Sequence, residues 1–101
     1  MEPVNIFAHQ GGFFRVLQRT PRSQAAVMTV APGGNAGPEE EHNGDQIIYI
    51  VEGEALVRVQ GKEYRASPGT LLTIPAHTRH YVENPGRSPV FFLTVYAPPV
   101  Y

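Results

Sequence analysis

The residues from Gly34 to Gly53 read GNAGPEEEHNGDQIIYIVEG, and this stretch decides the fold class. Its run Gln46–Val51 is dominated by Ile, Tyr and Val and lies between two turn sequences, Asn43-Gly44 and Glu52-Gly53. A short β-branched and aromatic run between turn residues is typical of a β-strand. Because side chains alternate between the two faces of a strand, both faces of this one are apolar. The stretch therefore predicts a strand that is covered on both sides.

Short apolar runs and turns alternate in both directions from this stretch. Ten Gly and ten Pro divide the 101 residues into short segments, and no apolar stripe with a period of about 3.6 residues survives between them. These features exclude a helical protein and predict an all-β sandwich or barrel, in one domain over residues 1–101. Seven strands are predicted: Phe13–Gln18, Gln24–Val30, Gln46–Val51, Ala55–Gln60, Thr70–Ile74, His80–Val82 and Val90–Tyr96.

The strand with two apolar faces also bears on assembly. In a chain of this length, something must cover the outer side of Gln46–Val51. The N-terminal strand could do so, and so could a second copy of the protein. We therefore expect a homodimer.

Potential metal ligands lie next to this strand. Glu40 and His42 are two residues apart, so on an extended backbone their side chains project from the same face. Gln46 has the same parity and follows a tight bend at residues 43–45, and a later strand of a closed sheet could supply His80 from across the interior. A carboxylate, two imidazoles and an amide could then surround one divalent metal ion.

The alternative interpretation is a solvated acidic loop, because residues 39–41 are three consecutive glutamates and most charge runs are solvent-exposed. We prefer the metal interpretation because a second His, His80, lies at a suitable place in an independent segment. We expect His9 and His77 at the surface, without a ligand role. Arg79 has the opposite parity to His80, and we expect it to point to solvent rather than over the mouth of the barrel.

The spacing of these residues resembles the two sequence motifs of the cupin family. The first motif runs Gly, five residues, His-x-His, three or four residues, Glu, six residues, Gly, and is matched here by Gly34, Glu40, His42, Gln46 and Gly53. The second runs Gly, five residues, Pro-x-Gly, two residues, His, three residues, Asn, and is matched by Gly69, Pro75, His77, His80 and Asn84. The resemblance covers nearly the whole chain. It implies a jelly-roll double-stranded β-helix, the cupin barrel, with a metal near one open end.

The chain departs from the cupin motifs at two ligand positions. Glu40 replaces the first His, and Gln46 replaces the Glu. The chain is similar to a subset of small single-domain cupins that share Glu-x-His-x3-Gln and a Tyr-x-Pro-Pro segment, here Tyr96–Pro99. Four ligands on a six-coordinate ion leave two positions open, which suits catalysis. Oxygen and imidazole ligands suit Fe, Mn, Ni or Zn, and the weak amide ligand predicts loose retention of the metal.

The resemblance leaves several functions open. It implies a metal-dependent enzyme that acts on a small oxygenated substrate, either dioxygenase-like or sugar-isomerase-like, and no separate catalytic base is identified. The alternative is a non-catalytic module in which the metal orients a carbohydrate or carboxylate ligand. An isomerase for phosphorylated sugars would need a phosphate clamp, and the candidate arginines, Arg15, Arg58 and Arg79, form no recognisable cluster.

Composition excludes other classes of function. The chain has no cysteine, so disulfides, thiolate metal sites and cysteine nucleophiles are absent. Its formal net charge is -1, and its eight Lys and Arg are scattered, which argues against a nucleic-acid or membrane-surface partner. No apolar run is long enough to span a membrane, and the start Met-Glu-Pro lacks the basic region of a secretion signal, so we expect a cytoplasmic protein.

Overall fold

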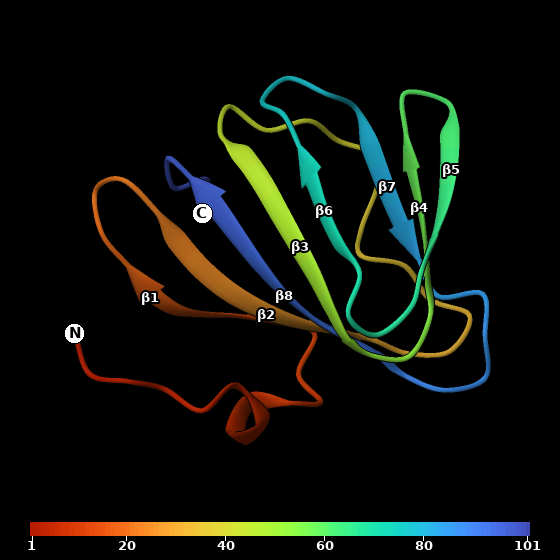
Figure 1. Ribbon diagram of the computed structural model, residues 1–101, viewed down its shortest axis with the longest axis horizontal. Helices are drawn as coiled ribbons and strands as arrows, with labels where there is room; N and C mark the ends of the chain where they lie inside the picture. Colours follow the sequence, from red (N-terminus) through yellow and green to blue (C-terminus); the bar gives the residue numbers. More distant parts are fainter.

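Short apolar runs between Gly and Pro turns form eight β-strands in the computed structural model, which describes residues 1–101 (Figure 1). One turn of 3₁₀ helix, η1 (Ile6–His9), precedes them and is capped by Asn5. This four-residue turn is far shorter than the helix needed to span a membrane, and the structure contains no candidate for such a helix. The strands are β1 (Phe14–Arg19), β2 (Gln24–Val30), β3 (Asp45–Glu52), β4 (Ala55–Val59), β5 (Lys62–Ala66), β6 (Leu71–Ile74), β7 (His80–Glu83) and β8 (Val90–Ala97).

The strands form two antiparallel sheets that face each other (Figure 1). The five-stranded sheet has the order β1-β2-β8-β3-β6, and the three-stranded sheet has the order β5-β4-β7. After β3 the chain crosses to the second sheet for β4 and β5, returns for β6, crosses again for β7 and returns for β8. Such repeated crossing between two sheets is the arrangement of a jelly roll. The predicted all-β jelly-roll fold is confirmed.

All seven predicted strands are present, and their ends differ from the prediction by one residue at most. The eighth strand, β5, was not predicted. Its sequence KEYRA is mostly polar, and only Ala66 is buried. The strand nevertheless pairs with β4 along its full length, from Ala55 opposite Ala66 to Val59 opposite Lys62. Backbone pairing, rather than an apolar pattern, accounts for this edge strand.

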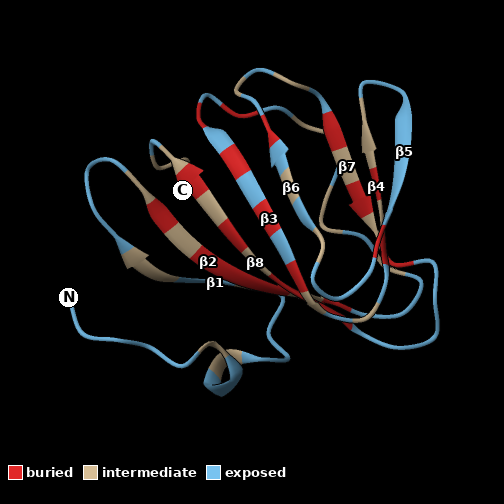
Figure 2. Ribbon diagram, viewed as in Figure 1, coloured by how far each residue is buried: buried red, intermediate tan, exposed pale blue.

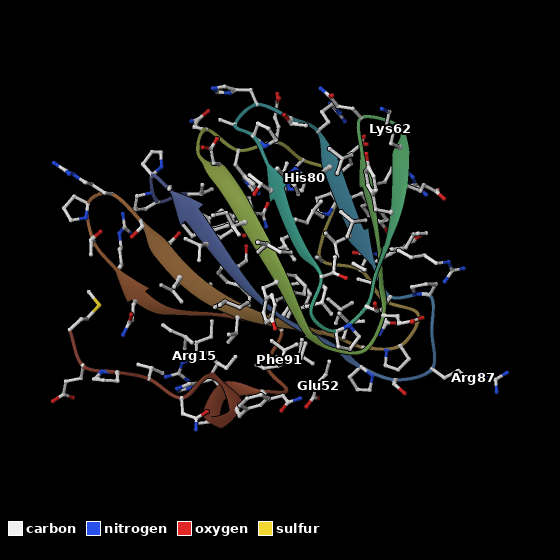
Figure 3. The ribbon with its side chains drawn as sticks, in the orientation of Figure 1. Arg15, Glu52, Lys62, His80, Arg87 and Phe91 are labelled. Carbon is white, nitrogen blue, oxygen red and sulfur yellow. The ribbon has the colours of Figure 1, made fainter.

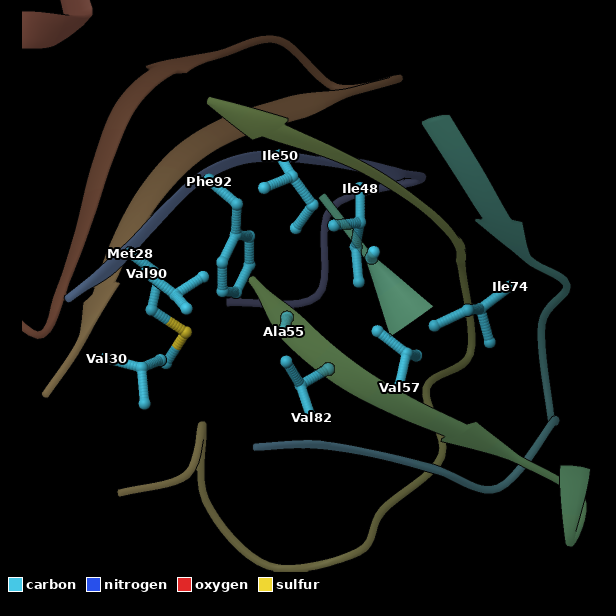
Figure 4. Close-up of a cluster of buried hydrophobic side chains, with 11 residues drawn as sticks. Met28, Val30, Ile48, Ile50, Ala55, Val57, Ile74, Val82, Val90 and Phe92 are labelled. Carbon is cyan, nitrogen blue, oxygen red and sulfur yellow. The ribbon is translucent and has the colours of Figure 1, made fainter. Parts of the chain in front are cut away.

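The hydrophobic core lies between the two sheets (Figure 4). Ile48 and Ile50 of β3 are completely buried and point toward Val57 and Val82 of the smaller sheet. Figure 2 shows the resulting alternation of buried and exposed bands along β3. Burial of each side chain of this size contributes about 1.5–3 kcal/mol to stability. Inward-facing apolar side chains therefore hold the two sheets together. The inward-facing polar residues lie outside this core.

Within one chain, the outer face of the larger sheet is only partly covered. The N-terminal segment lies against the outer side of β1, β2 and β8, where Pro3, Val4 and Ile6 adjoin Leu93, and Phe7 contacts Phe91 with ring centroids 5.9 Å apart. Over β3 and β6 the chain provides no such cover, and the exposed apolar side chains there are Ile47, Tyr49 and Leu71.

Candidate metal and ligand site

Backbone hydrogen bonds bring the segment before β3 to the start of β7. Glu40 and His80 exchange two of them: the Glu40 amide donates to the His80 carbonyl at 3.1 Å, and the His80 amide donates to the Glu40 carbonyl at 3.0 Å. The His77 amide donates to the His42 carbonyl at 2.7 Å. Three predicted ligands, Glu40, His42 and His80, therefore line one pocket.

Gln46 enters the same pocket from the larger sheet, and its side chain is oriented by two neighbours on β8. The Gln46 amide nitrogen donates to Thr94 Oγ1 at 3.1 Å and to the Tyr96 hydroxyl at 3.4 Å. Its carbonyl oxygen, Oε1, is the one buried side-chain polar atom that has no hydrogen-bond partner. Such a group costs about 1–3 kcal/mol when it stays unpaired. The pocket therefore contains an acceptor that lacks a partner from the protein.

The imidazoles of His42 and His80 lie side by side, with ring centroids 5.0 Å apart. His80 Nδ1–H donates to the Thr78 carbonyl at 2.9 Å, which leaves Nε2 as the free acceptor of the neutral ring. His42 Nε2 lies 3.6 Å from Glu40 Oε1. Burial lowers the pKa of His42 below its ordinary value, an effect that Glu40 opposes and His80 reinforces. The lowered pKa favours a neutral His42 imidazole with an available lone pair.

Two tyrosines, neither of them predicted from the sequence to belong to the site, complete the polar end of the pocket. Burial raises the pKa of both Tyr96 and Tyr101, so both phenols remain protonated donors. The Tyr101 hydroxyl donates to Glu40 Oε1 at 3.3 Å. Tyr96 lies opposite Gln46 in the β3–β8 register. The Tyr-x-Pro-Pro segment was the available signal, since it places Tyr101 shortly after the end of β8.

The pocket has a volume of about 180 Å³ and lies between the two sheets. Nine of its fifteen lining residues are hydrophobic, and none is Lys or Arg. Glu40 is the one carboxylate in the lining. The pocket therefore combines apolar walls with a cluster of carboxylate, imidazole, amide and phenol groups.

Other residues considered from the sequence lie outside the pocket. His77 is exposed and has φ +62°, the left-handed conformation expected of the Gly that it replaces. Arg79 is also exposed, and its guanidinium donates to Glu39 at 2.9 Å at the surface. Asn84 is buried, accepts from the Gly86 amide in the turn, and donates to the carbonyls of Val30 and Ser88.

The four predicted ligands match the chemistry of a divalent ion without forming a closed metal cage. As the side chains lie, no group of three or more His, Cys, Asp or Glu residues could hold a metal ion. The fourth predicted ligand is the amide of Gln46, whose oxygen is the unpartnered acceptor of the pocket. Two neutral imidazoles, one carboxylate and this amide oxygen are ligand types that Fe, Mn, Ni and Zn accept. The role of these residues as metal ligands remains a prediction.

Comparison with known proteins finds a family model, a curated relative and a solved structure that each match most of the chain. The family model described as Cupin domain matches residues 26–96. Tetracenomycin polyketide synthase protein TcmJ of Streptomyces glaucescens is 34% identical over 97% of this chain and 71% of that protein. The chain is also 32% identical over 79% of its length to mannose-1-phosphate guanylyltransferase of Klebsiella pneumoniae, but spans only 17% of that protein. The crystal structure of BH2720 from Bacillus halodurans has a TM-score of 0.91 at 28% identity, covering 99% of this chain and 83% of that one.

Proposed function

The chain belongs to the cupin family, and on this premise we propose that it binds one divalent metal ion together with a small oxygenated molecule. Glu40, His42, Gln46 and His80 would hold the ion. The unpartnered Gln46 Oε1 is the observation that carries the proposal, because this buried acceptor belongs to a pocket that two imidazoles and a carboxylate also line, and it lacks a positive partner. When bound, such an ion acts as a Lewis acid that polarises the oxygens of a ligand.

The neighbouring residues support this proposal by restricting the orientation of the ligands. Thr94 and Tyr96 take up the donor end of the Gln46 amide, so the oxygen end is the part left without a partner. The Thr78 carbonyl fixes the protonated nitrogen of His80 in the same way. Outer partners of this kind set tautomer and rotamer in metal sites. These hydrogen bonds leave one acceptor on Gln46 and one on His80, two residues that line the same pocket.

Enzymatic activity on a small oxygenated substrate is the leading version of the proposal. Four protein ligands leave positions on a six-coordinate ion for a substrate, which favours a reaction over a purely structural role. Between the two open reaction classes, the lining favours dioxygenase-like chemistry over an isomerase for phosphorylated sugars, because no Lys or Arg reaches the pocket. Figure 3 shows Arg15 near η1, away from His80. The alternative remains a binding module for a carbohydrate or carboxylate.

The test of the metal site is elemental analysis of protein purified without added metal or immobilised nickel. We expect near-stoichiometric Fe, Mn, Ni or Zn in the wild type, lost in His42→Ala and reduced in Gln46→Ala. His77→Ala is the matched control, because His77 is exposed outside the pocket, and it should retain the metal. Absence of metal from the wild type even after reconstitution would reject the proposal.

Chelation distinguishes the enzyme from a metal-stiffened module. The core of the barrel consists of apolar side chains from both sheets and does not include the proposed ligands. Removal of the ion should therefore lower the melting temperature only slightly while abolishing substrate turnover. A fall of many degrees with no turnover of any oxygenated substrate would favour the structural module.

We further propose that two copies of the chain associate through the outer side of β3 and β6. The observation behind this is the row of exposed apolar side chains Ile47, Tyr49 and Leu71, which face outward on adjacent strands. An exposed apolar face can pair with its own copy about a twofold axis, which is the commonest arrangement of homo-oligomers. The outer face of the other strands is already occupied by the N-terminal segment.

A further inference from the structure

We infer that the ligand of this pocket is a single planar ring that carries oxygen substituents but no phosphate or sulfate, and that Tyr101 is the residue that selects it. This inference deepens the proposed function and rests on it for the role of the polar end. Size, the distribution of polar groups and the anchoring of Tyr101 support it independently.

The size of the pocket limits the ligand to about one ring. Its volume is about 180 Å³. Pockets for drug-sized ligands usually measure about 300–1,000 Å³, whereas an apolar cavity of about 150 Å³ in a protein core binds benzene. A six-membered ring with one or two small substituents therefore fills this pocket, and a nucleotide or a disaccharide exceeds it.

The walls of the pocket favour a flat apolar ring over a sugar. Along β8, Tyr96 pairs with Gln46 at the polar end, while Phe92 pairs with Ile50 and belongs to the hydrophobic core. Both Phe92 and Tyr96 line the pocket, so its polarity falls along the strand. A pyranose carries hydroxyls around its whole circumference, and those on the Phe92 side would be buried without partners. An aromatic or conjugated ring with its oxygens on one edge places no polar group against Phe92, so it avoids this cost.

The charge of the pocket argues against phosphorylated and sulfated ligands. Glu40 is its one carboxylate, and no Lys or Arg lines it. Two of the arginines form ion pairs outside the pocket, Arg79 with Glu39 and Arg58 with Glu63, and Arg19 donates to the carbonyl of Tyr101. A dianionic phosphate would thus enter beside a carboxylate, with no cationic side chain to accept it.

Tyr101 is held at the pocket by its backbone, and its partly exposed side chain lines the pocket. The side chain of Gln24, which is 1% exposed, accepts from the amides of Val100 and Tyr101 at 3.2 and 3.0 Å and donates to the Tyr101 carbonyl at 2.6 Å. Arg19 donates to the same carbonyl at 2.7 Å. Residues 100–101 are therefore tied to β1 and β2, although they lie beyond the last strand.

The Tyr101 ring packs against aromatic neighbours at the mouth of the pocket. Its centroid lies 5.0 Å from that of Phe14, 5.3 Å from Tyr96 and 5.8 Å from His42. These distances are in the range of aromatic packing. The rings therefore form an aromatic wall, against which a planar ligand can pack. The Tyr101 hydroxyl, now on Glu40 Oε1, is a donor for an oxygen on the edge of such a ligand.

The experiment is a fluorine NMR titration with 4-fluorocatechol, performed on chelator-treated protein and on protein reloaded with Zn²⁺, with the zinc content of every sample measured. Glucose 6-phosphate is added as a competitor. The variants are Tyr101→Ala, Tyr101→Phe and the control Tyr64→Ala, which removes a tyrosine of similar exposure on β5, outside the pocket. Tyr101 is itself exposed, so its replacement leaves the core intact.

We expect 4-fluorocatechol to bind both forms of the wild type and glucose 6-phosphate not to displace it. Tyr101→Ala should weaken binding about tenfold, Tyr101→Phe should retain the contribution of the ring, and Tyr64→Ala should change nothing. Displacement by glucose 6-phosphate, or unchanged affinity in Tyr101→Ala, would overturn the inference. Zinc retention without 4-fluorocatechol binding would overturn it while leaving the metal site standing. Binding to zinc-free protein that fails to take up zinc would support the ring-shaped ligand and reject the metal proposal.

Discussion

The amide of Gln46 combines a fully engaged donor end with an unpartnered acceptor end, and this asymmetry makes its replacement informative. Glu in its place would bring a second negative charge to the pocket beside Glu40. Because the affinity of such sites rises with ligand charge, we expect Gln46→Glu to bind Mn²⁺ or Zn²⁺ at least about tenfold more tightly. The metal-free variant should melt at a lower temperature than the wild type, since two carboxylates then share one pocket.

Competition with a chromophoric chelator measures the first effect, and thermal melting in the presence of excess chelator measures the second. The control is Glu63→Gln, a change of one charge on exposed β5, which should leave metal affinity unchanged. Equal metal affinity in Gln46→Glu and wild type would show that position 46 is not a ligand.

The lowered pKa of His42 predicts a pH dependence of stability in the metal-free protein. The folded state binds a proton on His42 less readily than the unfolded state, where the pKa is near the ordinary 6.5. Between these two values the unfolded chain holds more protons, so the free energy of unfolding falls as the pH falls below about 6.5. His42→Gln should lack this part of the dependence. Melting curves from pH 8 to pH 5 measure it, and parallel curves for the two proteins would contradict the prediction.

The sequence predicted that Glu40, His42 and Gln46 lie together, and the structure places them in one pocket, but the sequence did not predict the residues that reach the pocket only through distant contacts. Glu40, His42 and Gln46 follow one another within a few positions, and strand parity places them on one side. The Tyr101 hydroxyl donates to Glu40, 61 positions away, and the Tyr101 amide donates to Gln24, 77 positions away. No local pattern records such contacts, because they depend on the loop that follows β8.

Among the connecting segments, the bend before β3 depends on a glycine for steric reasons. A Cβ on Gly44 would lie 2.4 Å from the Pro98 carbonyl oxygen and 3.1 Å from the Ala97 carbonyl carbon, and both atoms belong to the backbone. The bend and the segment after β8 therefore touch main chain to main chain. Through this contact, the ligand segment of the pocket is linked to the segment that carries Tyr101.

We expect Gly44→Ala to lower stability by about 1–3 kcal/mol, as overpacking against backbone usually does, and to release residues 98–101. Gly12→Ala is the matched control, because its Cβ would meet no atom within 4 Å and its φ is ordinary. Denaturant unfolding measures the first effect, and the rate of digestion by carboxypeptidase measures the second. Wild-type values for both in Gly44→Ala would refute the link.

The strands themselves show which physical signals a sequence carries. The strands β2 and β8 contribute inward and outward apolar rows and were predicted to within one residue at each end. The edge strand β5 has a single buried side chain, so neither apolar alternation nor β-branched composition marks it. Its position follows from β4, whose unpaired backbone groups it satisfies.

The outer side of β3 and β6 is an apolar surface that the chain leaves uncovered. The oligomeric state in solution therefore tests the proposed dimer. We expect sedimentation equilibrium to give twice the 11.1 kDa of one chain. Ile47→Glu should shift the protein to the monomer, because it would bury a charge in the apolar contact. Tyr64→Glu, at an exposed aromatic of the other sheet, should not. A monomeric wild type would mean that β3 and β6 face solvent in this protein.

The placement of the tyrosines has a practical consequence for following the site. The chain has five Tyr and no Trp, and three of the five, Tyr81, Tyr96 and Tyr101, line the pocket. Without tryptophan, the ultraviolet emission of the protein arises mainly from tyrosine, and most of these emitters border the same small volume. An ion or ring that enters the pocket will change their quantum yield, so the native protein carries its own optical reporter and needs no label.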